Sequence, residues 1–133
     1  MNCRVSTDGG SSFVTSASYD KAAQYGNSLN NDKGSSRYQN DNEWEYFFTS
    51  DNSSTSGTGG SYAFLYNLGN TRYSSFTGMS SLHNGNNSSL YYVYQSGIIQ
   101  LGEIHNCFTI FASNGSHKVK GEFQLYGLRG VPT

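Results

Sequence analysis

Charged residues are scarce in this chain of 133 residues, making up only 13% of it, about half of the usual share. Eight Lys and Arg oppose nine Asp and Glu, which leaves a net charge of −1. Such a charge supplies no electrostatic field that would attract nucleic acid or an anionic membrane. No stretch of the sequence approaches the roughly 20 apolar residues that span a bilayer. We therefore expect neither nucleic acid as a partner nor insertion into a membrane.

Cysteine is also rare, since the chain contains only Cys3 and Cys107. Their wide separation excludes the close spacing of a zinc knuckle or a redox-active Cys pair. The two residues are therefore either buried thiols or the ends of one long-range disulfide. The thiol interpretation is favoured, because an isolated Cys on an apolar face is usually buried.

Tyrosine and small polar residues take the place of charge. The chain is 15% aromatic, with 11 Tyr, and it contains 16 Gly. Tyr packs well on a pleated sheet while its hydroxyl stays in water, whereas long amphipathic helices need more Glu, Lys, Ala and Leu. Turns rich in Gly and Asn separate short runs of Val, Ile, Thr, Tyr and Phe. The sequence thus predicts a single all-β domain over residues 1–133, an antiparallel β-sandwich.

Roughly eight strands are expected from these runs. Alternation in the seventh run places Ile104, Phe108 and Ile110 in the core, and the last run places Phe123 and Leu125 there. Residues 50–61, rich in Ser and Gly, are expected to form a long surface loop. The predicted strands are residues 2–6, 17–25, 43–49, 61–67, 72–83, 90–95, 104–112 and 118–128.

Three separated motifs resemble a family of β-sandwich domains that is common in virion proteins of tailed bacteriophages. RVSTDGGSSF at residues 4–13 is similar to the family's R-x-S-x-D-G-G hairpin, and GEFQLYGLR at residues 121–129 to its closing strand, G-x-F-x-L-Y-G-L. LYNLGNTRYSSFTGMSS at residues 65–81 is similar to its L-Y-N-P-G turn and the T-G-x-S-S strand that follows. The resemblance implies a jelly-roll-like sandwich and a structural or adhesive role, without catalysis, in a fibre, spike or other surface appendage of the virion. Decoration of the capsid head is the alternative within this class.

The resemblance also implies association with other virion proteins and with copies of the same chain, for which a trimer is typical of phage appendages. Members of the family carry an apolar strand before the first motif, whereas here Met1 leads almost directly into a strand-like run. We therefore expect an unpaired edge at the first strand and a domain that lacks this strand or shares it with a partner.

A carbohydrate-active enzyme on a sandwich fold is the alternative from a different class. Glu43 and Glu45 flank Trp44, so in a strand both carboxylates point to one side and the indole to the other. Such a pair could act as glycosidase acids only if a cleft lay above it. An exposed strand with solvated charges explains the same pattern, and no catalytic residue is assigned.

No metal site or cofactor is predicted. His83, His105 and His117 are scattered and lack the HxH or HExxH spacing that brings two imidazoles onto one ion.

Recognition by aromatic side chains remains as a function. Aromatic residues here lie among Asn, Gln and Ser, a mixture that suits sugar hydroxyls above a ring face and equally suits a protein interface. A glycan of the host surface is the candidate ligand. The candidate binding residues are Trp44, Tyr46, Tyr91, Tyr92 and Tyr94.

Overall fold

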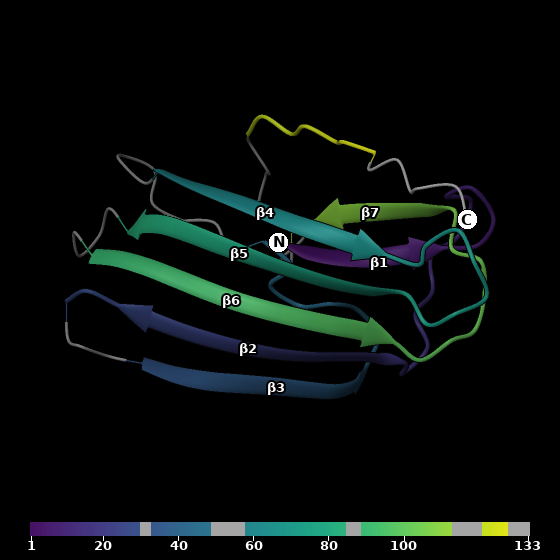
Figure 1. The fold of residues 1–133 in the computed structure, drawn as a ribbon, viewed down its shortest axis with the longest axis horizontal. Coiled ribbons are helices and arrows are strands. Elements are labelled where there is room, and N and C mark those ends of the chain that lie inside the picture. Colours follow the sequence, from purple (N-terminus) through teal and green to yellow (C-terminus); the bar gives the residue numbers. More distant parts are fainter. Residues whose placement is uncertain (30–32, 49–57, 85–88, 113–120, 128–133) are drawn as a thin grey trace, which may run out of the picture.

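The computed structural model describes residues 1–29, 33–48, 58–84, 89–112 and 121–127, and within them the chain forms seven strands in two antiparallel sheets (Figure 1). This arrangement is sandwich-like, which confirms the predicted all-β class. The strands are β1 (Asn2–Ser6), β2 (Tyr19–Asn27), β3 (Lys33–Asp41), β4 (Thr58–Tyr66), β5 (Ser75–Asn84), β6 (Ser89–Ile99) and β7 (Cys107–Phe111).

The larger sheet has the strand order β3-β2-β6-β5-β4, and the smaller sheet pairs β1 with β7. In Figure 1 the β1–β7 pair lies behind the five-stranded sheet. We call the face turned toward this pair the inner face and the opposite face the outer face. Side chains alternate between the two faces along each strand: in β2, Lys21 and Ala23 are buried on the inner face, whereas Ala22 and Gln24 are exposed on the outer face.

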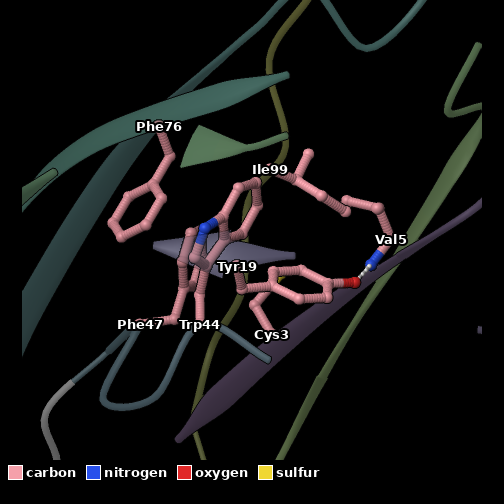
Figure 2. Packing of buried hydrophobic residues seen from close by; sticks show 7 residues of the cluster. All are labelled: Cys3, Val5, Tyr19, Trp44, Phe47, Phe76 and Ile99. Carbon is pink, nitrogen blue, oxygen red and sulfur yellow. Dashed lines mark hydrogen bonds between the residues drawn. The ribbon is translucent and has the colours of Figure 1, made fainter. Parts of the chain in front are cut away.

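The core lies between the sheets and is built around Trp44, which is fully buried (Figure 2). Its indole meets the ring of Tyr19 edge-on at 5.4 Å and the ring of Phe76 at 4.9 Å. The Tyr19 hydroxyl donates to the Val14 carbonyl at 3.0 Å and accepts from the Val5 amide at 3.1 Å, so its polar end is satisfied. Aromatic rings from both sheets and from the chain between them therefore form one core.

Residues 44–48 cross the inner face, held there by polar side chains of the large sheet. Lys21 Nζ donates to the Glu45 carbonyl at 2.6 Å, and Gln95 Nε2 donates to the carbonyls of Tyr46 and Phe47 at 2.7 and 2.6 Å. We call residues 44–48 the inner strap. Because buried backbone carbonyls need donors, these side chains let an irregular segment lie in the interior.

The loop after β1 explains why its motif combines Ser, Asp and Gly. The Asp8 carboxylate accepts from Ser6 Oγ at 2.7 Å, from the Ser12 amide at 2.9 Å and from Ser12 Oγ at 2.6 Å. These hydrogen bonds, those from Ser12 above all, hold the pKa of the Asp8 carboxyl well below its ordinary value. Gly9 and Gly10 have φ of 73° and 92°, where side chains are strained.

Two differences from the expected strands concern the middle of the chain. β3 was not predicted, because its sequence KGSSRYQND has no apolar row; it is an edge strand organised by its pairing with β2. The strand predicted at residues 43–49 is wrong over its described part, where only an isolated bridge between Cys3 and Trp44 forms. Trp44 and Phe47 are buried as parts of the inner strap and not as parts of a sheet.

The predictions for the end of the chain are partly wrong. Residues 121–127 form no strand, and Phe123 and Leu125 are 54% and 79% exposed rather than buried. Residues 118–120 and 128 lie outside the described residues. In the seventh run Phe108 and Ile110 pack against the core as expected, whereas Ile104 is 51% exposed. Residues 50–57 of the predicted loop are also outside the described part, and residues 58–61 belong to β4.

The first strand does not have the unpaired edge that its position suggested. β1 pairs with β7 on one side. On the other side Cys3 and Trp44 exchange two backbone hydrogen bonds of 3.0 Å, and the Phe48 amide donates to the Met1 carbonyl at 3.2 Å. Cys3 and Cys107 are both free; Cys3 is buried, Cys107 half-buried.

Candidate binding face

The outer face of the large sheet presents a row of long side chains at its centre. In the pairing register Tyr62 of β4 lies opposite Met79 of β5, Met79 opposite Tyr94 of β6, and Tyr94 opposite Gln24 of β2. We call these four residues the outer ridge. Tyr62 and Tyr94 are 51% and 55% exposed, so the rings are supported by the sheet and open to solvent.

Two aromatic neighbours widen the outer ridge. Phe64 is two residues from Tyr62 on β4, and the two rings meet edge-on at 5.8 Å. Tyr92 is two residues from Tyr94 on β6, with ring centroids 6.1 Å apart. Tyr92 also lies opposite Gly26, and its ring occupies the space that a Cβ there would take, with the hydroxyl 2.8 Å from that position. Contacts of this kind hold the rings in place, which lowers the entropy that ligand binding costs.

A shallow groove of about 690 Å³ runs beside the outer ridge across four strands. Its floor is made of short side chains, because Thr77, Ser96 and Ala22 follow one another across β5, β6 and β2 in the register. Tyr94 lines one side of the groove, and Arg37 of β3 closes one end. We call this the outer groove. It combines an aromatic wall, hydroxyl and amide groups and one cation.

A second hollow of about 580 Å³ lies on the other side of the outer ridge, lined by Tyr62 and Met79 together with Ser81, His83 and Leu90. The ridge therefore stands between two depressions. Neither is an enclosed cavity of the kind that sequesters a small substrate from water.

The five residues predicted to bind do not form one site. Tyr92 and Tyr94 lie on the outer face. Trp44 is a core residue with no exposed surface. Tyr46 lies on the inner strap and is 50% exposed, and Lys21 Nζ lies 4.9 Å from the centroid of its ring. Tyr91 is on the inner side of β6 and stacks on Tyr25 at 6.0 Å.

The outer face also contains residues that were not among the predicted binding residues: Gln24, Arg37, Tyr62, Phe64 and Met79. The alternation of SYAFLY at residues 61–66 could have revealed two of them, since it places Tyr62 and Phe64 on one face of β4.

The two glutamates flanking Trp44 have different surroundings. Glu43 Oε2 forms an ion pair of 2.6 Å with Arg4, and Glu43 Oε1 accepts from the Asn2 side chain. For Glu45, burial and then the charge of Asp41 raise the pKa of the carboxyl above its ordinary value. Glu43 is therefore engaged with the small sheet, and neither carboxylate lines the outer groove or the second hollow.

Other chemistry is sparse in the described part of the chain. No group of three or more His, Cys, Asp or Glu side chains there is arranged to hold a metal ion. The described residues likewise include no helix with the length and apolarity needed to cross a membrane. Comparison of the chain with models of known protein families, with curated proteins and with solved structures finds no match.

Proposed function

We propose that this protein is a non-enzymatic binding module that attaches to carbohydrate through the outer face of its five-stranded sheet. The observation that carries the proposal is the outer ridge with its neighbours Phe64 and Tyr92. Four aromatic rings, each between 42% and 55% exposed, stand together on one face beside a groove with a polar floor. Clustered exposed aromatic surface on a folded domain marks an interaction site.

The chemistry of the outer groove suits a sugar. The C–H faces of a sugar ring pack against an aromatic face such as that of Tyr94, while the hydroxyls of the sugar need hydrogen-bond donors and acceptors nearby. Gln24, Thr77 and Ser96 supply these around the groove. The groove crosses several strands and stays open, so it fits a chain of sugars better than a small substrate held in a closed pocket.

The setting we propose is the surface of a tailed-phage virion, in a fibre, spike or other appendage. Support comes from the motifs at residues 4–13 and 121–129 and from the low charge and high Tyr content. The jelly-roll topology belongs to this proposal as well. The alternative role, capsid decoration, would place the chain on the head of the particle and not on an appendage. Mass spectrometry of purified virions tests whether the chain is present, and imaging shows where it lies. Absence of the polypeptide from such particles would reject the virion setting while leaving carbohydrate binding open.

Binding is tested with an array of bacterial surface oligosaccharides, followed by calorimetry on any ligand found. Tyr94→Ala should weaken binding by at least about tenfold, which corresponds to about 1.4 kcal/mol. The matched control is Tyr73→Ala, since Tyr73 is 51% exposed but follows β4 in the turn toward β5. Equal loss in both variants, or no binding to any glycan on the array, would reject the proposed function.

A further inference from the structure

Residues 121–127 have the side-chain pattern of a β-strand. Gln124 Nε2 donates to Glu122 Oε1 at 3.0 Å, and the Tyr126 hydroxyl donates to Gln124 Oε1. Side chains two residues apart that touch in this way lie on the same side of an extended backbone. Phe123 and Leu125 alternate with them.

This segment has no sheet in the described structure. It is not part of any of the seven strands, and no backbone hydrogen bond joins it to another described residue. All seven residues are exposed, including Phe123, Leu125 and Tyr126 at 54%, 79% and 75%. An extended segment with an apolar side, whose backbone groups have no partner among the described residues, is a template for pairing with another strand.

Four of the described strands end a sheet: β1, β3, β4 and β7. The outer edge of β1 is already bonded to the inner strap, which leaves β3, β4 and β7 to accept the segment. β3 carries Lys33, Arg37 and Asp41, and charges on an edge discourage further pairing. β7 has only five residues. β4 has nine residues, TGGSYAFLY, with no charge and no proline, so it is the edge with the least protection.

We propose that residues 121–127 of one copy of this protein add as a strand to β4 of a second copy, at the edge of β4 that pairs with no other described strand. In Figure 1 this segment, drawn in yellow, lies beyond the β4 edge of its own sheet, on the outside of the molecule. Glu122 is the only charge that it brings to the uncharged β4 edge, so backbone pairing meets no repulsion there.

The side-chain pattern agrees on both faces of the extended sheet. On β4, Ala63 and Leu65 pack against the core, and Tyr62 and Phe64 lie on the outer face. In one of its two possible registers, the added strand places Phe123 and Leu125 on the inner side, beside Ala63 and Leu65. Tyr126 then lies on the outer face, beside Tyr62 and Phe64. The added strand therefore covers apolar surface on the inner side and lengthens the aromatic outer face. Reciprocal exchange of the segment closes a symmetric dimer.

The experiment is sedimentation of the full chain over a wide concentration range. The wild type should form a discrete oligomer that dissociates on dilution. The double substitution Phe123→Asp and Leu125→Asp should raise the dissociation constant at least about 100-fold, because two apolar side chains lose their burial. Both residues are exposed in the single chain, so the variant should fold normally, which far-ultraviolet circular dichroism checks.

Gln124→Asp is the matched control, since it adds a charge to the same segment on the side that stays exposed, and it should still associate. Hydrogen exchange identifies the acceptor: the amides of β4, but not of β3 or β7, should gain protection as concentration rises. A monomer at every concentration, association that survives the double substitution, or β4 protection without concentration dependence would each overturn the proposal. None of these readouts involves carbohydrate, so this inference and the proposed function fail independently.

Discussion

Gly97 of β6 and Phe76 of β5 lie directly opposite each other, and the phenylalanine ring covers the glycine. A Cβ added to Gly97 would be 2.5 Å from Phe76 Cε1, 2.7 Å from the Asp20 carbonyl oxygen and 2.9 Å from Trp44 Nε1. The same pairing of aromatic ring and glycine recurs between Tyr92 and Gly26 on the outer face. Cross-strand glycines thus give large rings a place to lie on this sheet.

Gly97→Ala should destabilise the fold by about 1–3 kcal/mol, because the added methyl group meets a backbone carbonyl and two buried rings that cannot all yield. Urea unfolding measures the change. Gly60→Ala is the control, since nothing lies within 4 Å of a Cβ there. Equal stability of the two variants would show that the Phe76 ring does not pack on Gly97.

Trp44→Ala should cost about 3–5 kcal/mol of unfolding free energy, as expected for a fully buried aromatic side chain. Phe123→Ala, at a residue that is 54% exposed, should change stability by less than about 0.5 kcal/mol in the dilute single chain. Thermal or urea unfolding at low protein concentration tests both. A large loss from Phe123→Ala would mean that the closing segment is buried within its own chain.

His105 should make the fold less stable in mild acid. It is fully buried, its Nδ1 lies 2.7 Å from Ser74 Oγ, and burial lowers the pKa of the imidazole below its ordinary 6.5. As the pH falls below about 6.5, the His105 imidazole becomes protonated in the unfolded chain while it stays neutral in the folded chain. The free energy of unfolding therefore decreases with falling pH. Urea midpoints of wild type and His105→Gln between about pH 7.5 and 5 measure this. Parallel curves for the two proteins would contradict the prediction.

Lys21 should make the stability of the fold depend on pH in the alkaline range. Burial lowers the pKa of its ammonium from 10.5 to about 8. Between these values the unfolded chain holds more protons than the folded chain, so the contribution of Lys21 to stability rises with pH. Burial raises the pKa of Tyr19 to about 12, and this residue acts in the opposite direction above about pH 10.

The difference between wild type and Lys21→Met isolates the lysine, since the other groups titrate in both proteins. In urea unfolding at several pH values from about 7.5 to 10, the stability of wild type relative to the variant should increase with pH. A constant difference would mean that the Lys21 ammonium keeps its proton throughout.

Local alternation and turn residues predicted much of the fold. β1 was predicted with its observed bounds, and most of β2, β5 and β7 lies within predicted strands, because apolar and polar residues alternate there. β3 was not predicted, since an edge strand can form without a row of apolar side chains. For residues 43–48 a strand was predicted where none forms. The apolar pattern of Trp44 and Phe47 is compatible both with a strand and with an irregular segment that crosses the core.

The candidate site shows the same division. Of the candidate binding residues, Tyr92 and Tyr94 are exposed on the outer face, whereas Trp44, which has equally polar neighbours in sequence, lies in the core. Whether an aromatic residue faces water depends on whether the fold places it between the two sheets or on an outer surface. That information is absent from any short stretch of sequence.

By itself the sequence determined the all-β class, the abundance of surface tyrosine and the Asp-Gly-Gly loop, because each of these follows from residue type and from contacts between near neighbours. Tertiary structure alone decided that Trp44 is buried, that Tyr62, Met79, Tyr94 and Gln24 line up across four strands, and that residues 121–127 join no sheet formed by the described residues. These outcomes depend on strand order and register, which are set by contacts between residues far apart in the chain.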